Sequence, residues 1–148
     1  MEAVRNIVLD VTSKKGILAY AIMHEGKVID KHTEDCKYAN QYENLIAGYI
    51  KGVKSLVSIL ENNMDYKGNV YIVSSNSALI SWMSRGYALP KYLDKFNVLR
   101  ELIEHIPTNV EFICSPNCIS SEYATKTCRD MDKRRQFESV TSIDEFLE

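Results

Sequence analysis

Two acidic residues, Asp10 and Glu43, lie where a carboxylate could do chemistry. Asp10 is the one acid in a largely apolar run from Val4 to Val11, and Glu43 follows Asn40 by three residues at the start of a long apolar pattern. A buried carboxylate is costly unless a metal or a partner compensates its charge. Carboxylate oxygens are also the ligands that hard divalent cations prefer. The two acids therefore predict a metal-binding or partner-binding site if the fold brings them together.

Each acid also has a purely structural explanation. Asp10 precedes a Thr-Ser pair, and an aspartate at the end of a strand commonly caps the following turn. Glu43 would lie in the first turn of a helix, where the macrodipole favours an acid whatever its function. The residue types alone leave both interpretations open.

Hydrophobic periodicity predicts the elements that position these acids. The first third of the chain is typical of three antiparallel strands joined by tight turns, because short β-favourable runs alternate with Lys-Lys-Gly and Glu-Gly. A long helix then follows from Asn40, which is a plausible N-cap, to Leu60. The expected strands are Val4–Val11, Ile17–Met23 and Lys27–His32.

The second half of the chain predicts further strands alternating with helices. The expected elements are a strand at 69–73, a short helix at 79–83, a helix at 92–106, a strand at 110–114 and a polar, basic helix at 121–135. The order β-β-β-α-β-α-α-β-α indicates one mixed sheet covered by helices, which is an α/β fold.

Length and composition indicate a single domain. The chain has 148 residues, of which 45% are hydrophobic, enough to bury a core. We expect the domain to span residues 1–135 and residues 136–148 to form a short acidic C-terminal tail or helix. Ser142 and Glu145 have capping-box spacing in that tail.

Charge and cysteine content exclude several classes of protein. The formal net charge is −2 and the pI is about 5.9, so no global cationic field collects nucleic acid. The N-terminus carries no secretion signal and no apolar run could span a membrane. We therefore expect a cytoplasmic protein with free thiols. No cysteine pair has the C-x-x-C spacing of a zinc knuckle, which disfavours a zinc site.

The predicted element order, with Asp10 and Glu43, resembles the ribonuclease H family (type 1). The closest local match is the segment Asn40-Gln41-Tyr42-Glu43-Asn44-Leu45-Ile46-Ala47, which reproduces the family's asparagine, its glutamate three residues on and an alanine four beyond that. The resemblance covers Val4 to Met131. It implies a five-stranded mixed sheet, with three antiparallel strands and then two further strands, flanked by helices.

The same resemblance assigns four catalytic positions, of which two have lost their charge. The family's strand-one aspartate and helix-one glutamate correspond to Asp10 and Glu43. The aspartate that ends strand four is Asn76 here, and the aspartate of the last helix is Thr125. The family's Mg²⁺ or Mn²⁺ would be held by Asp10, Glu43 and Asn76, with binding weak or lost because two carboxylates replace four.

The resemblance also implies a set of residues that contact nucleic acid, either an RNA–DNA hybrid or double-stranded RNA. Asn117 stands where bacterial members carry a loop histidine. Cations in the last helix would meet phosphates, although a basic helix balanced by an acidic tail is equally typical of a solvated face. The expected nucleic-acid contacts are Thr12, Lys14, Asn40, Ser77, Asn117, Lys126 and Arg129.

These residues favour one function over two alternatives. The leading hypothesis is a ribonuclease H-like protein with a degenerate two-metal site that binds nucleic acid with weak or no nuclease activity. One alternative is an active, Mg²⁺- or Mn²⁺-dependent ribonuclease H-type endonuclease. The other is a protein-interaction or inhibitory module that does not bind nucleic acid, which the acidic pI favours.

Overall fold

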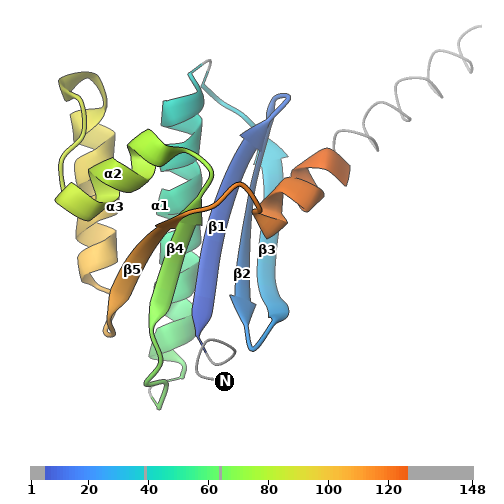
Figure 1. Cartoon of the computed structure of the whole chain (residues 1–148), viewed down its shortest axis with the longest axis vertical. Coiled ribbons are helices and arrows are strands. Elements are labelled where there is room, and N and C mark those ends of the chain that lie inside the picture. Colours follow the sequence, from blue (N-terminus) through green and yellow to red (C-terminus); the bar gives the residue numbers. More distant parts are fainter. Residues whose placement is uncertain (1–5, 39, 64, 127–148) are drawn as a thin grey trace, which may run out of the picture.

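A computed structural model describes residues 6–38, 40–63 and 65–126 (Figure 1). Residues 119–126 are helical at the end of the described chain. No helix in the described ranges is long and apolar enough to cross a bilayer. The other elements, in chain order, are β1 (Ile7–Lys14), β2 (Ile17–His24), β3 (Lys27–Asp35), α1 (Gln41–Glu61), β4 (Val70–Ser74), α2 (Ser77–Arg85), the short 3-10 helix η2 (Pro90–Tyr92), α3 (Leu93–Glu104) and β5 (Val110–Cys114).

The five strands form one mixed sheet in the order β3-β2-β1-β4-β5. β1, β2 and β3 pair antiparallel, whereas β1 pairs parallel with β4 and β4 pairs parallel with β5. Both hairpins turn through two residues at positive φ, Lys15-Gly16 and Glu25-Gly26. Such turns match the right-handed twist of the flanking strands. The predicted sheet of three antiparallel strands followed by two more is confirmed.

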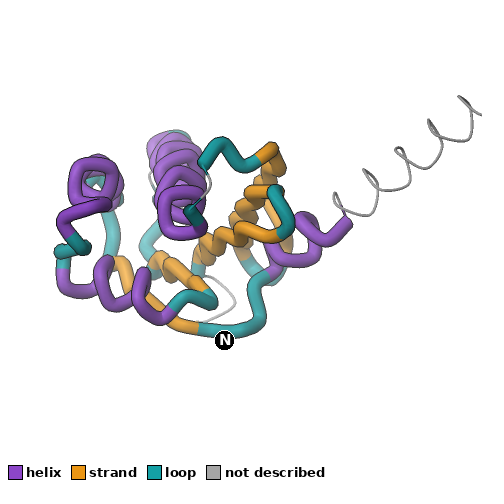
Figure 2. The backbone as a smooth tube through the Cα atoms, turned by 90° about the horizontal axis from the view of Figure 1, so that it is seen from above, coloured by secondary structure: helices purple, strands orange, loops and turns teal. Residues whose placement is uncertain are grey.

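The helices form layers on both faces of the sheet. Seen from above, α1 and the helix 119–126 lie on opposite sides of the strands (Figure 2). α1 lies close to the sheet because two glycines face it. A Cβ on Gly48 would lie 2.6 Å from Val11 Cγ1, and one on Gly52 would lie 2.8 Å from Leu9 Cδ1. Leu9 and Val11 therefore point toward α1, and strand alternation directs Asp10 to the other face.

Aromatic packing joins α1, α2 and η2. The rings of Tyr42 and Trp82 have centroids 5.1 Å apart, and those of Trp82 and Tyr92 are 5.8 Å apart. Trp82 is 7% exposed, so it is a core residue rather than a platform for stacking bases.

Several element boundaries differ from the sequence-based predictions by a few residues; α2, for example, spans Ser77–Arg85 rather than 79–83. β1 continues to Lys14 and β3 to Asp35, because the antiparallel pairing extends through Lys14–Ile17 and Ile17–Asp35. The last helix begins at Ile119 rather than Ser121. The predicted continuation of that helix to residue 135 and the acidic segment 136–148 lie outside the described residues.

Candidate functional site

Asp10 joins the first strand to the last helix. Its Oδ2 accepts a hydrogen bond from the backbone N–H of Ile119 at 2.9 Å, and its Oδ1 accepts one from the N–H of Ser120 at 2.8 Å. These are two of the N–H groups that have no partner within a helix at its N-terminus. Asp10 therefore acts as a helix cap supplied by a residue more than one hundred positions earlier in the chain.

The surroundings of Asp10 disfavour its charge. The residue is 3% exposed, and burial raises the pKa of its carboxyl group above the ordinary value. Hydrogen bonds from Ser120 and Ile119 lower the pKa in part, whereas the charge of Glu122 raises it further. Thr12 lies on the same face of β1, and its Oγ1 is 2.7 Å from Ser120 Oγ. Capping thus stabilises the ionised form without fully offsetting its desolvation.

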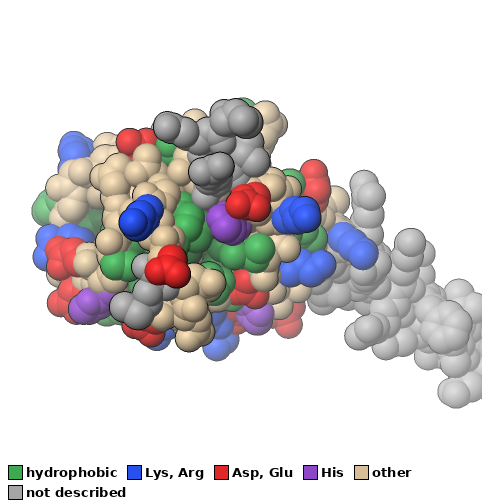
Figure 3. Space-filling model, turned by 90° about the horizontal axis from the view of Figure 1, so that it is seen from below, with side chains coloured by type: hydrophobic (Ala, Val, Ile, Leu, Met, Phe, Trp, Pro, Cys, Tyr) green, Lys and Arg blue, Asp and Glu red, His purple; other side chains and the backbone are tan. Residues whose placement is uncertain are grey.

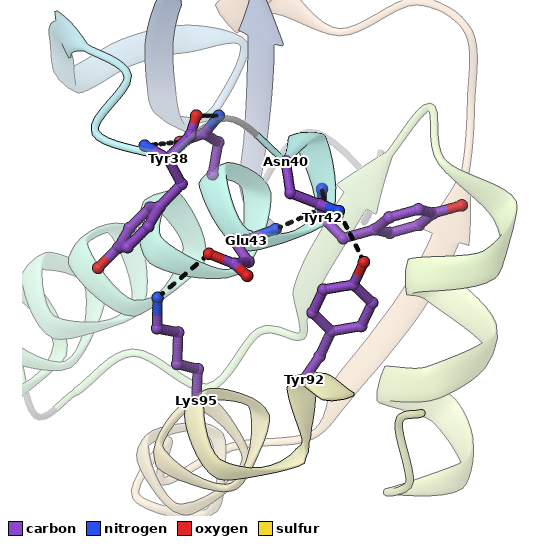
Figure 4. Close-up of polar contacts among 7 residues, drawn as sticks. Tyr38, Asn40, Tyr42, Glu43, Tyr92 and Lys95 are labelled. Atoms are coloured by element: carbon purple, nitrogen blue, oxygen red, sulfur yellow. Dashed lines mark hydrogen bonds and ion pairs between the residues drawn. The ribbon is translucent and has the colours of Figure 1, made fainter. Parts of the chain in front are cut away.

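Glu43 lies in the other helical layer, where it meets a residue of α3. It is in the first turn of α1, and its Oε2 is 3.5 Å from Lys95 Nζ of α3 (Figure 4). The same ammonium lies 3.4 Å from the ring centroid of Tyr38. The described contact of Glu43 is thus with Lys95 of α3 rather than with Asp10, and α1 covers the face of the sheet opposite to Asp10.

The asparagines and the serine predicted to belong to the site lie at helix starts. Asn40 is the N-cap of α1: its Oδ1 accepts from Tyr42 N–H at 2.8 Å, and its Nδ2 donates to Tyr92 Oη at 2.7 Å. Asn76 is the N-cap of α2, with Oδ1 accepting from Leu79 N–H at 3.0 Å. Ser77 is the first residue of that helix. Both asparagine carbonyl oxygens are therefore already engaged.

The remaining predicted residues gather near the helix 119–126. Lys14 Nζ donates to Thr125 Oγ1 at 3.1 Å, which places the β1–β2 turn beside Lys126. Asn117 lies in the loop before the helix, with its backbone N–H donating to Ser115 Oγ at 3.2 Å. Arg129 lies outside the described residues.

The residues present do not fit the two-metal centre that the resemblance implies. Such a centre needs several carboxylates around two closely spaced cations. In the described part of the chain, no group of three or more His, Cys, Asp or Glu side chains is arranged to hold a metal ion. Asp10 binds helix amides, Glu43 binds Lys95, and Asn76 and Thr125 carry no charge.

The cysteines near this region are thiols. Cys36, Cys114 and Cys118 are free. Burial raises the pKa of the Cys118 thiol to about 11, and the charge of Asp10 adds to this effect. A thiol with a raised pKa is a poor nucleophile at neutral pH, which disfavours Cys118 as a nucleophile.

Sequence reasoning missed the partners of Asp10 because they are backbone groups. Ile119 and Ser120 contribute their N–H groups, and no side-chain type marks such a role. One signal was present. The last helix starts at Cys-Ile-Ser-Ser and has no acidic N-cap of its own, so an acid from another part of the chain could cap it.

Comparison with known proteins identifies the fold through structure alone. No protein-family model matches the sequence, and no curated protein matches it. Among solved structures, the N-terminal RNase H domain of Rv2228c from Mycobacterium tuberculosis, solved as a fusion with maltose binding protein, aligns with a TM-score of 0.63 and 13% identity. That alignment covers 82% of this chain and 94% of that one.

A second similar structure is LC11-RNase H1, isolated from compost by a metagenomic approach. It aligns with a TM-score of 0.63 and 15% identity over 82% of this chain and 89% of that one. In its complex with an RNA/DNA hybrid, the same enzyme aligns with a TM-score of 0.60 over 76% of this chain and 85% of that one. The chain therefore has a ribonuclease H-like fold of the type 1 kind, and at these identities the likeness establishes the fold.

Proposed function

We propose that this protein is a ribonuclease H-like domain that binds nucleic acid, an RNA–DNA hybrid or double-stranded RNA, with weak or no hydrolysis. One observation carries the proposal: the Asp10 carboxylate accepts hydrogen bonds from the backbone N–H groups of Ile119 and Ser120. A carboxylate committed to capping a helix is a poor ligand for a catalytic cation. A Mg²⁺ or Mn²⁺ ion held by carboxylates would activate the attacking water.

Support for a nucleic-acid partner comes from similar structures. LC11-RNase H1 and the foamy viral protease–reverse transcriptase were both solved in complex with RNA/DNA hybrid. The second aligns with a TM-score of 0.54 and 11% identity, over 81% of this chain and 18% of that chain. The RNA/DNA hybrid in these two complexes is the reason to propose the same class of ligand for this chain.

The chain's own contribution would be a local group of cations. Lys14 ends β1 and Lys15 follows it in the turn to β2, and Lys14 contacts Thr125, the residue before Lys126. The end of the molecule seen in Figure 3 instead mixes acidic and basic side chains. Since phosphate contacts dominate nucleic-acid affinity, we assign binding to the corner formed by Lys15 and Lys126.

The test is fluorescence anisotropy with labelled RNA–DNA hybrid, double-stranded RNA and double-stranded DNA at several salt concentrations. We expect Kd to rise with salt for the hybrid or the RNA duplex. The double variant Lys15→Glu/Lys126→Glu should weaken binding by about tenfold or more, because two phosphate contacts become repulsive. The matched control is Lys54→Glu/Lys67→Glu, two exposed lysines elsewhere, which should change Kd by less than about twofold.

Two outcomes would reject the proposal. One is the absence of salt-dependent binding to any of the three duplexes. The other is an equal loss of affinity in the test variant and the control, which would indicate a nonspecific effect of charge. Circular dichroism of every variant verifies that the fold is retained.

A further inference from the structure

In the part of the chain that the structure describes, the face of the sheet that carries Asp10 is only half covered. The helix 119–126 packs over β1 and β2, where Ala124 meets Ile17 and Ala19. The small Ala19 lets the helix lie close to the strands, and both alanines are completely buried. Over β4 and β5 the same face is open. A hollow of about 480 Å³ lies there, beside the N-terminus of the helix.

The floor of the hollow is apolar and is built by four adjacent strands. Val8 of β1 is the lateral partner of Met23 on β2, and Val73 of β4 is the lateral partner of Ile113 on β5. Lateral partners share one face of a sheet. Ile113 is 40% exposed, so water covers a large aliphatic side chain at the open edge. Uncovered apolar surface of this kind marks sites of association.

The rim of the hollow is acidic. Glu122 lines it from the first turns of the helix and is exposed, and the buried carboxylate of Asp10 lies in its wall. Glu111 is the exposed neighbour of Ile113 on the same face of β5. No lysine, arginine or histidine is among the lining residues in the described part of the chain. Lys31 lies elsewhere, 4.7 Å from the ring centroid of Tyr123.

We propose that this hollow is a docking site for a basic, amphipathic segment of a partner protein. An apolar side chain of the partner would cover Val8, Met23 and Ile113, and a lysine or arginine beside it would meet Glu122. The argument is charge complementarity. The floor is aliphatic, the rim carries acids, and no cation among the described residues lines the hollow, so the complementary ligand is a lysine or arginine, whose long apolar side chain ends in a positive charge. The volume lies in the range of about 300–1,000 Å³ typical of small binding pockets.

The acidic rim also separates this surface from the one assigned to nucleic acid. Phosphates would be repelled by Glu122 and Glu111, whereas the Lys15 and Lys126 corner attracts them. Glu122 and Lys126 lie one turn apart on the helix 119–126, so the two surfaces adjoin there. The two proposals are tested with different ligands and different variants, so the failure of one leaves the other standing.

A displayed library of random peptides, selected on the full chain, tests the proposal. We expect enriched sequences to place Lys or Arg next to Leu, Ile, Met or Phe. Anisotropy of one labelled enriched peptide should then show a loss of about tenfold or more in affinity for Ile113→Ser/Glu122→Lys. The matched control is Val98→Ser/Glu101→Lys, an exposed pair of the same residue types on α3, with an expected change of less than about twofold.

Several results would overturn the assignment. These are enrichment of acidic or uncharged peptides, no enrichment at all, or equal loss of affinity in the two double variants. If a second copy of this chain occupied the hollow, sedimentation would show a dimer. The variant Ile113→Ser/Glu122→Lys would then dissociate that dimer. Binding of single-stranded RNA, seen as NMR shifts of the Met23 and Ile113 methyl groups, would assign the hollow to nucleic acid instead.

Discussion

The carboxylate of Asp10 in β1 accepts the backbone N–H of Ser120 at 2.8 Å, across 110 positions of sequence. This contact, with its neighbour from Ile119, attaches the last helix to the central strand of the sheet. The helix adds a small apolar cluster, in which Ala124 and the half-buried Tyr123 pack against Ile17 and Ala19. Capping by Asp10 fixes the start of the helix, and the contacts of Thr12 with Ser120 and of Lys14 with Thr125 attach it further.

Removing the cap should detach the start of the helix. Asp10→Ala leaves two buried N–H groups without acceptors, and we expect the free energy of unfolding to fall by about 1–3 kcal/mol. Hydrogen exchange of the Ile119 and Ser120 amides should accelerate. Urea denaturation and exchange mass spectrometry measure the two effects. Glu104→Ala, an exposed acid on α3, is the control, and an equal effect in both variants would contradict the capping role.

Stability should depend on pH through Asp10. Its folded-state pKa is raised above the ordinary value of 3.8, with burial as the largest cause. Folding therefore favours the protonated carboxyl, and the stabilisation is complete below pH 3.8 and is lost as pH rises through the raised pKa. Relative to Asp10→Asn, which does not titrate, the wild type should lose stability as pH rises across this window. A constant difference between the two proteins at all pH values would refute this assignment.

Because α1 lies close to the sheet, a substitution that raises the helix propensity of α1 should nevertheless destabilise the protein. Alanine is a better helix former than glycine by about 1 kcal/mol. A Cβ at Gly48 would nevertheless lie 2.6 Å from Val11 Cγ1 and 2.7 Å from Leu18 Cδ1. We expect Gly48→Ala to lower the free energy of unfolding by about 1–3 kcal/mol through overpacking. Thermal denaturation monitored by Trp82 fluorescence measures it, and a rise in Tm would show that α1 can move away.

Most of the fold was predictable because local signals agree with the final structure. Positive-φ turns at Lys15-Gly16 and Glu25-Gly26 mark the hairpins. Asn40 caps α1 as its position indicated, and Gly86 ends α2 in the left-handed conformation. Each of these signals is encoded within a few residues, so no tertiary information was needed.

The candidate site was less predictable because it depends on which face of β1 a side chain takes. Asp10 has apolar neighbours on both sides in the sequence, Leu9 and Val11. Such a continuous apolar run does not indicate which face of the sheet the long helix will cover. α1 covers Leu9 and Val11, which directs Asp10 to the other face of the sheet, where it meets the helix 119–126. The missing acidic cap at the start of the last helix was the one sign of an outside partner, and it did not indicate that Asp10 would supply the cap.

The most direct test is a single-turnover cleavage assay with excess protein over a labelled RNA–DNA hybrid, in Mg²⁺ and separately in Mn²⁺. It includes the wild type, Asp10→Asn, and Asn76→Asp/Thr125→Asp, which restores the two missing acids. We predict that the hybrid is bound and stays intact in all three, because Asp10, where it is retained, remains bound to the Ile119 and Ser120 amides and Glu43 remains paired with Lys95. Metal-dependent cleavage by the wild type that Asp10→Asn abolishes would contradict the account.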